Sequence, residues 1–388
     1  MRAGKFIFFT FFCIFGSSLA DESTDAFTGD LLRAVFSQSN VQQNTVLSPV
    51  SLYDVTALLQ QGSGGNSLEE LTKVLHADAP TTRKRYADLI RSIKADHSET
   101  QLEFANKVYI ENGFPIQESF RSVAVQDFQA GIENIEFKQA QQAADDINDW
   151  VSENTHGRIK DLVKSDSLTP DTAMVLLNAV FFAGNWTYQF EPYGTVDSSF
   201  TTLDRQTKSV SMMHLSETLM AGEIEELNAK FVRLPFRGDE FSMIIVVPND
   251  VDGLSDLIDK LQEDHLASIL ASAERRNVDL SLPKFKFSTT SKLVPTLQKL
   301  GLNDIFTDAS NLTGIASSPP LYVSDVTQKA DIEVDERGAT AAAATSVTGA
   351  GSGLPLNVLY IEANHPFMFF IVNDIDFLPI FSGWVGNP

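Results

Sequence analysis

The sequence contains a single cysteine, Cys13, and it lies close to the amino terminus. Disulfide bonds therefore cannot stabilise the rest of the chain, so a large hydrophobic core must do so. Hydrophobic residues make up 43% of the 388 residues, which suffices for such a core. Basic residues are also few: 29 Lys and Arg against 51 Asp and Glu give a net charge of −22. This charge makes nucleic acid and anionic membranes poor partners.

Motifs for catalysis and for metal binding are absent from the sequence. The six histidines form no His-x-x-x-His pair, and no paired cysteines accompany them, so no zinc site is predicted. There is no Gly-x-Ser-x-Gly motif and no glycine loop of the phosphate-binding type. We therefore expect no catalytic residue, no metal and no cofactor, and a hydrolase is the rejected alternative.

The first 20 residues have the pattern of a secretory signal peptide. Two basic residues, Arg2 and Lys5, precede the apolar run "FIFFTFFCIF", and the small residues of "GSSLA" follow it. An apolar run of this length cannot span the roughly 30 Å of a bilayer core. We expect residues 1–20 to be removed, and residues 21–388 to form one secreted, soluble, monomeric domain.

Hydrophobic periodicity predicts helices first and a mixture of helices and strands later. Amphipathic helices are expected at residues 85–97 and 143–159. The uniformly apolar residues 173–186 predict a central strand that is covered on both faces. A hairpin is predicted to turn at Arg237-Gly-Asp239, and residues 278–290 alternate as one strand does. This order indicates a single α+β domain with large sheets.

Residues 338–361 form a stretch of 24 residues without a charged side chain. Uncharged loops of this length are uncommon in folded domains and are usually functional or disordered. A flexible tether is one interpretation of this composition. A helix seeded by residues 341–344 is a second, although four alanines are too few to hold a helix in water. A segment that becomes a strand inside a sheet is the third.

Five motifs in order resemble those of the serpins: "NTVLSPVSL", "LLNAVFFAGNW", "LPFRGDEFSMIIVVP", "LYVSDVTQKADIEVDERGATAAAAT", and "HPFMFFI" with "FSGWVGNP". The resemblance covers residues 21–388. It implies the serpin fold, with three β-sheets, eight or nine helices and an exposed reactive-centre loop at about residues 338–361. It also implies that this loop is presented as bait to a target protease and, once cut, inserts into the main sheet.

The hinge implied by the resemblance has the composition that insertion needs. Alternate side chains from Ala339 to Gly349 would enter the packed face of the sheet, and all of them are small and uncharged. Gly338 would allow the sharp bend at the pivot. The hinge residues are Glu336, Arg337, Gly338, Ala339, Thr340, Ala341, Ala342, Ala343 and Ala344. The loop therefore resembles that of an inhibitory serpin, and a non-inhibitory carrier or storage serpin is the main rival.

The family spacing of 16 residues after Glu336 implies a scissile bond between Ser352 and Gly353. A small residue before the cut suits an elastase-like or subtilisin-like serine protease, and the loop contains no Arg or Lys for a trypsin-like enzyme. A papain-like cysteine protease stays open as an alternative target. Such an enzyme could read Val347 and cut between Thr348 and Gly349.

The resemblance also implies a region where the main sheet opens. The family usually has a histidine at the position of Gln328, with a hydrogen bond to the residue that matches Asn178. Glutamine both donates and accepts, so we expect a similar bond here. How easily the sheet opens, and whether opening depends on pH, are the properties that this substitution would change. The assigned residues are Asn44, Ser48, Ser51, Asn178, Trp186 and Gln328.

Two further surface features have alternative interpretations. Heparin binds to the corresponding helix in some serpins, so a glycosaminoglycan site is one explanation of a basic cluster, and a solvated helix face interrupted by acidic residues is the other. The cluster is Arg83, Lys84, Arg85, Arg91 and Lys94. Asn311, in "NLT", is predicted to be glycosylated. Asn185, in "NWT", is expected to be unmodified because its strand is buried.

Overall fold

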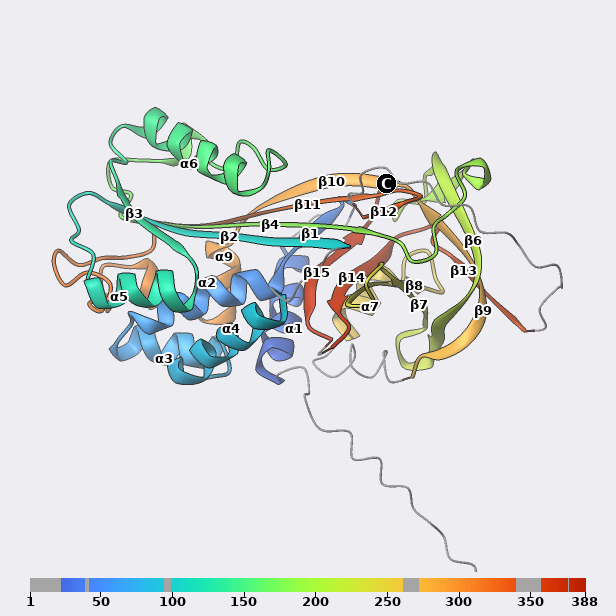
Figure 1. The fold of residues 1–388 in the computed structure, drawn as a ribbon, viewed down its shortest axis with the longest axis horizontal. Helices are drawn as coiled ribbons and strands as arrows, with labels where there is room; N and C mark the ends of the chain where they lie inside the picture. Colours follow the sequence, from blue (N-terminus) through green and yellow to red (C-terminus); the bar gives the residue numbers. More distant parts are fainter. Residues whose placement is uncertain (1–21, 39–41, 94–98, 261–271, 340–356, 376) are drawn as a thin grey trace, which may run out of the picture.

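The computed structural model describes residues 22–38, 42–93, 99–260, 272–339, 357–375 and 377–388. A long six-stranded sheet crosses the molecule, and a nine-stranded sheet packs against one end of it (Figure 1). The predicted signal peptide and residues 340–356 of the uncharged segment lie outside the described residues. Within the described residues, no helix is both long and apolar enough to cross a membrane.

Eight α-helices are present in the described residues, and most of them lie on one face of the six-stranded sheet (Figure 1). Helix α2 is buried between this sheet and the other helices. It starts at Pro49, and the Ser48 side chain caps it by accepting a hydrogen bond from the Ser51 backbone N–H. The helices are α1 Glu22–Phe36, α2 Pro49–Gln61, α3 Gly65–Val74, α4 Ala79–Ile93, α5 Glu118–Ser122, α6 Ala140–Asn154, α7 Leu254–Lys260 and α9 Val294–Leu300.

The six-stranded sheet has the order β10-β11-β12-β4-β2-β3. Strand β4 is buried along nearly its whole length, which confirms the central strand predicted at residues 173–186. It pairs in antiparallel fashion with β2 and in parallel fashion with β11. The strands are β2 Thr100–Glu111, β3 Gly131–Ile135, β4 Met174–Asn185, β10 Phe285–Lys292, β11 Asp325–Val334 and β12 Gly338–Ala339.

The nine-stranded sheet has the order β1-β15-β14-β8-β7-β6-β9-β13, and β5 pairs with β6. Hydrogen bonds join the three sheets implied by the resemblance into two, because the long β6 pairs with β7 over one stretch and with β5 and β9 over another. The strands are β1 Thr45–Leu47, β5 Val196–Thr201, β6 Thr207–Ile224, β7 Ala229–Pro235, β8 Phe241–Pro248, β9 Glu274–Pro283, β13 Val358–Glu362, β14 Phe367–Asn373 and β15 Pro379–Val385.

Helix α6 lies on the opposite face of the six-stranded sheet from the other helices (Figure 1). Its buried residues Ala143, Ile147 and Val151 pack in one hydrophobic cluster with β2 and β4. The Lys107 ammonium group of β2 lies 4.9 Å from the ring centre of Trp150 on α6, and 2.7 Å from the carboxylate of Glu133. Apolar packing and a cation–π contact therefore hold α6 on the sheet.

Three predicted elements differ from the structure. Helix α6 runs from Ala140 to Asn154, whereas the prediction was residues 143–159. Helix α4 begins at Ala79, six residues before the predicted start, because the Asp78 carboxylate accepts a hydrogen bond from the Thr81 N–H and caps the first turn. Residues 278–290 belong to two strands, not one. The chain leaves the nine-stranded sheet after Pro283 and enters the six-stranded sheet at Phe285. The alternation of side chains continues across this change, so the sequence pattern does not show where one strand ends and the next begins.

Candidate functional site

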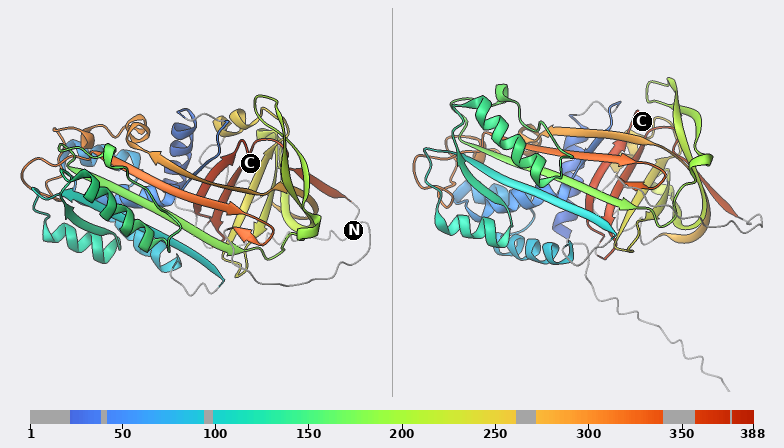
Figure 2. Two further views of the ribbon diagram at one scale, coloured as in Figure 1. Left: turned by 90° about the horizontal axis from the view of Figure 1, so that it is seen from above. Right: turned by 45° about the horizontal axis from the view of Figure 1, so that its top comes forward.

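The candidate site lies where β11 and β4 separate. The two strands pair in parallel from Asp325 opposite Val175 to Ala330 opposite Val180. At the far end β12 lies between them: Ala339 pairs with Val334 of β11 and with Gly184 of β4. Figure 2 shows β12 as a short strand between the ends of its two longer neighbours. The start of the uncharged segment therefore already occupies a strand position in the sheet.

The chain enters this position through a tight turn. The Asp335 carboxylate accepts hydrogen bonds from the backbone N–H groups of Arg337 and Gly338, at 2.8 and 3.2 Å. The Asp335 N–H donates to the Gly338 carbonyl at 3.0 Å. A Cβ atom on Gly338 would lie only 2.0 Å from the Gly184 carbonyl oxygen. Glycine is required at this pivot because the backbone of β4 passes so close to it.

Trp186, at the end of β4, binds the outer side of the turn. Its indole N–H donates to the Asp335 carbonyl at 3.0 Å, and its backbone N–H donates to the Arg337 carbonyl at 2.7 Å. The indole ring stacks on Phe236, with the ring centres 4.5 Å apart. The aromatic core therefore fixes where the hinge turns.

Glu336 is held by two side chains that the sequence analysis did not identify. Its carboxylate lies 2.8 Å from the Lys284 ammonium group and accepts a hydrogen bond of 2.8 Å from the Thr195 hydroxyl. Burial by itself would raise the pKa of Glu336, but these hydrogen bonds and the charge of Lys284 together lower it. Glu336 is therefore ionised at neutral pH and ties the hinge to the segments on either side of it.

Ala339 is the last described residue before the loop, and only 1% of its surface is exposed. It belongs to the hydrophobic cluster between the two sheets, together with Val334 and Phe236. Ala339 thus already points inward in the intact chain, whereas the sequence analysis expected this orientation of alternate hinge residues on insertion. The hinge residues 340–344 lie outside the described residues, as do both predicted scissile bonds, Ser352–Gly353 and Thr348–Gly349.

A cluster of buried amides closes the middle of the β11–β4 pair. The Gln328 amide donates to the Asn178 side-chain oxygen at 2.6 Å and to the Ser48 carbonyl at 2.9 Å, and its oxygen accepts from the Ser48 N–H at 2.8 Å. Asn178 in turn donates to the Ser51 carbonyl at 3.0 Å and to the side chain of Asn106 at 2.5 Å. Gln328 therefore makes the bond to Asn178, and the cluster links β2, β4 and β11 to the start of α2.

The six predicted sheet-opening residues lie in three different places. Gln328, Asn178, Ser48 and Ser51 lie together in this amide cluster. Trp186 lies at the hinge. Asn44 binds the carboxy-terminal segment instead, where its side chain accepts hydrogen bonds from the Gly386 and Asn387 N–H groups at 2.9 and 2.8 Å.

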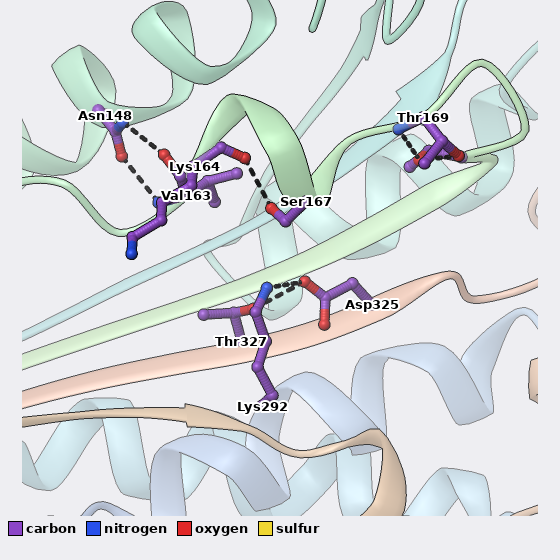
Figure 3. Close-up of polar contacts among 9 residues, drawn as sticks. Asn148, Val163, Lys164, Ser167, Thr169, Lys292, Asp325 and Thr327 are labelled. Carbon is purple, nitrogen blue, oxygen red and sulfur yellow. Dashed lines mark hydrogen bonds and ion pairs between the residues drawn. The ribbon is translucent and has the colours of Figure 1, made fainter.

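Polar side chains hold the first residues of β11, at the opposite end of the strand from the hinge (Figure 3). Thr327 donates a hydrogen bond of 2.9 Å to the Asp325 carboxylate, and Lys292 of β10 binds both residues.

Figure 3 also shows the Asn148 side chain of α6, which donates to the Val163 carbonyl at 2.8 Å and accepts from the Val163 N–H at 3.0 Å. These bonds hold the segment after α6 against the helix.

The predicted basic cluster is only partly exposed in the structure. Arg83 forms an ion pair of 2.5 Å with Asp127, and the Arg85 guanidinium donates to the Tyr53 hydroxyl at 3.2 Å. Burial lowers the pKa of Arg85. Lys84 is exposed; the side chain of Arg91 and all of Lys94 lie outside what the structure describes.

The two glycosylation sequons occupy different environments. Asn311 is half-buried, and its side-chain oxygen accepts a hydrogen bond of 2.8 Å from the Thr313 hydroxyl. A Cβ atom on Gly64 would lie 2.9 Å from the Asn311 amide nitrogen, so the amide packs closely against that glycine. The Asn185 side-chain oxygen is buried and has no hydrogen-bond partner among the described residues.

Comparisons with known proteins identify the family. The family model described as serpin (serine protease inhibitor) matches residues 22–388. Antichymotrypsin-2 of Bombyx mori is 36% identical over 361 residues, which cover 92% of this chain and 96% of that protein. Antitrypsin of the same organism is 35% identical over 371 residues, 95% and 94% of the two chains. The chain belongs to the serpin family.

Solved serpin structures have the same fold as this serpin. The structure of Serpin48 of Tenebrio molitor is 31% identical, covers 94% of this chain and 97% of that one, and gives a TM-score of 0.85. The α+β serpin fold expected from the motifs is therefore confirmed. Serpins act on proteases as inhibitors, so the family and these relatives support protease inhibition as the general function.

Proposed function

We propose that this serpin is a secreted suicide substrate that traps its target protease as a covalent acyl-enzyme. The observation that carries the proposal is the position of Ala339, which is buried between β11 and β4 in the intact chain. The residues that follow Ala339 are all small and uncharged as far as Gly353. They can extend β12 without a steric clash or the cost of burying a charge.

The proposed reaction starts at the reactive-centre loop. The protease nucleophile attacks the carbonyl carbon of the residue before the scissile bond, the peptide bond breaks, and the new amino terminus leaves. An acyl-enzyme then joins the protease to the amino-terminal part of the loop. That part inserts between β11 and β4 and carries the protease with it. Hydrolysis of the acyl bond needs tight geometry in the protease, so deforming the protease leaves the bond intact. The serpin itself contributes no catalytic residue.

Insertion requires β11 and β4 to separate past the amide cluster. The bonds between Gln328 and its partners Asn178 and Ser48 must then break or rearrange. Because a glutamine side chain does not titrate, we propose that opening at this position does not depend on pH. A histidine there would titrate near neutral pH.

The composition of the loop favours an elastase-like or subtilisin-like serine protease that cuts between Ser352 and Gly353. No Arg or Lys occurs in residues 338–361, so a trypsin-like pocket finds no ion pair in the loop. A papain-like cysteine protease is the second candidate, with Val347 as the residue it reads and Thr348–Gly349 as the bond it cuts.

Incubation with a protease panel tests this proposal. We expect a covalent complex, resistant to denaturing electrophoresis, with at least one elastase-like, subtilisin-like or papain-like enzyme. Mass spectrometry of the released carboxy-terminal peptide then identifies the bond: a peptide starting at Gly353 supports the serine protease and one starting at Gly349 the cysteine protease. If every enzyme cuts the loop and leaves free, the chain is a non-inhibitory serpin and the proposal is wrong.

Secretion and glycosylation belong to the same proposal. We propose cleavage after Ala20. We also propose glycosylation at Asn311, because Thr313 and Gly314 beside it are exposed, whereas the Asn185 side-chain oxygen is buried. Glycosaminoglycan binding to the basic cluster is the weaker part, because Arg83 is already paired with Asp127 and Arg85 with Tyr53. The mass of the protein secreted from a eukaryotic host, before and after removal of N-glycans, tests the first two points.

A further inference from the structure

Helix α2 contains one buried acid that lies outside both the hinge and the amide cluster. Asp54 is in the middle of the helix, and only 3% of its surface is exposed. Its Oδ2 atom is buried and has no hydrogen-bond partner among the described residues. An ionised carboxylate at such a place costs much more free energy than a neutral carboxylic acid does, because no protein group replaces the water that the charge loses. The fold therefore depends on the charge state of Asp54.

Helix α4 packs against α2 and brings Tyr86 near Asp54 (Figure 1). Tyr86 is buried, and its ring stacks on Phe128 with the ring centres 4.9 Å apart. Burial raises the pKa of the Tyr86 hydroxyl, and the negative charge of Asp54 raises it further. The Arg85 guanidinium donates to the Tyr53 hydroxyl at 3.2 Å. The titratable neighbour of Asp54 on α4 is therefore a phenol that stays neutral.

The strands that pack against α2 present no titratable side chain to it. Strands β4 and β15 contain none. On β2, successive side chains point to opposite faces. Val108 packs in the cluster that includes α2, whereas Tyr109 packs with α6 on the other face. The titratable residues of β2 all share the face of Tyr109, and they are Glu103, Lys107, Tyr109 and Glu111.

The other charged side chains that the structure describes on α1, α3 and α4 are bonded elsewhere or exposed. Those bonded elsewhere are Asp30, Arg33, Glu70 and Arg83. Those exposed are Glu69, Lys73, Lys84 and Asp88. Burial is the cause that acts on Asp54, and it raises the pKa of this carboxyl well above its ordinary value of 3.8. The folded chain therefore keeps its proton on Asp54 in a pH range where an exposed aspartate is ionised.

Asp54 lies close to the side of α2 that holds the sheet closed. Ser51, three residues earlier, donates to the Asn106 side-chain oxygen at 3.3 Å, and its carbonyl accepts from Asn178 at 3.0 Å. Residues three apart are neighbours on a helix surface. A shift of α2 at Asp54 therefore also moves Ser51, which is part of the amide cluster.

We propose that Asp54 is a proton switch that sets how firmly α2 holds the six-stranded sheet. With its proton, Asp54 leaves α2 packed on α4 and the amide cluster intact. When the proton leaves to solvent, the buried charge favours a shifted α2 that admits water and binds the cluster less firmly. Gln328 does not titrate, so the pH response of the sheet comes from this residue. An effect on loop insertion rests on the proposed function, whereas the switch itself does not.

The direction of the pKa change fixes the sign of the pH dependence. Because folding raises the pKa of Asp54, the residue stabilises the fold fully below its ordinary value of 3.8. That contribution is lost as the pH rises through the folded pKa. The sheet should therefore open more readily at pH 8 than at pH 5.

Thermal unfolding of Asp54→Asn tests the titration, because asparagine has nearly the same shape and cannot ionise. Asp149→Asn, an exposed position on α6, is the matched control. We expect the midpoint of Asp54→Asn, relative to wild type, to rise by about 3–6 °C between pH 5 and pH 8. The control should keep a constant difference from wild type. A difference for Asp54→Asn that is equally constant would overturn the switch.

Amide hydrogen exchange tests the link to the sheet without any protease. Comparing wild type with Asp54→Asn in one buffer cancels the intrinsic effect of pH on exchange. We expect residues 175–180 of β4 and 325–330 of β11 to exchange about three- to tenfold faster in wild type at pH 8, and equally fast at pH 5. Equal exchange at both pH values, with the thermal effect present, would confine Asp54 to stability and overturn its link to the sheet. Asp54→Ser, which is smaller and also uncharged, repeats both measurements if Asp54→Asn does not fold.

Discussion

The same two strands, β11 and β4, are held in opposite ways at the amide cluster and at the hinge. In the amide cluster, buried side chains of Gln328, Asn178 and Ser51 join the strands to each other and to α2. At the hinge, the strands are separated by Gly338 and Ala339, the smallest side chains available, and backbone hydrogen bonds do most of the holding. The sheet is thus locked by side-chain chemistry where it is closed and depends on small volume where a strand enters.

The comparison explains why the hinge can already lie in the sheet while the middle stays shut. A buried amide left without its partner costs about 1–3 kcal/mol, so the cluster resists partial opening. An alanine that slides between two strands gains apolar burial and leaves no polar side-chain group unsatisfied. In the proposed mechanism, opening therefore begins at the hinge and must break the amide cluster before the strands can separate as far as Asp325 and Val175.

The largest expected effect comes from a charge at the entry point. Ala339→Arg would place a guanidinium group among the apolar side chains between the sheets, where burying its charge costs free energy. We expect this variant to be cut as a substrate and to form little or no covalent complex. The ratio of inhibitor used to protease trapped measures this loss.

Arg337→Ala is the control for that variant, because the Arg337 side chain is exposed and its removal changes the charge without filling the strand position. It should inhibit as wild type does. Loop-cleaved wild type should also melt well above the intact protein, and cleaved Ala339→Arg much less so. An unchanged stoichiometry in Ala339→Arg would contradict insertion at this position.

The next effect concerns the amide cluster. Gln328→Ala removes three hydrogen bonds at a fully buried site and leaves Ser48 and Asn178 without their partners. We expect a loss of about 3 kcal/mol in the free energy of unfolding. Gln142→Ala, on the exposed surface of α6, is the matched control and should change stability little. Equal effects of the two variants, measured by thermal or urea unfolding, would show that the cluster does not lock the sheet.

The smallest effect is at the ion pair beside the hinge. Glu336 has a pKa below its ordinary value of 4.5, so the paired carboxylate stabilises the fold above that pH and loses its contribution as the pH falls through the folded pKa. Glu336→Gln should therefore lower the free energy of unfolding by about 0.5–1 kcal/mol at pH 7, and this loss should shrink as the pH falls below 4.5. A loss that stayed the same throughout an acid titration of both proteins would contradict a role for the charge of Glu336.

Features that depend on local composition could be predicted from the sequence. The uniformly apolar residues 173–186 indicated a strand covered on both faces, and β4 is such a strand. The turn at Arg237-Gly-Asp239 also lies where its residues place it, since Gly238 and Asp239 both adopt positive φ angles. Part of the hinge could have been found as well: Asp335 three residues before Gly338 is a spacing in which a carboxylate caps a turn.

Features that join distant segments could not be predicted in this way. The residues next to Glu336 and Gln328 do not indicate the partners Lys284 and Ser48, because Lys284 is 52 residues from Glu336 and Ser48 is 280 residues from Gln328. Nor could the sequence place Asn44 away from the amide cluster, since its partners are backbone groups at the far end of the chain.

The sequence by itself determined that the segment after Glu336 can enter a sheet, because side-chain size and charge are properties of each residue alone. Only the tertiary structure decided how far this segment enters the sheet. It also decided which side chains hold the rest of the β11–β4 pair closed. Those answers depend on how closely the Gly184 backbone approaches Gly338, and on which side chains the register of β2, β4 and β11 brings together. Distances of that kind exist only once strands far apart in sequence have paired.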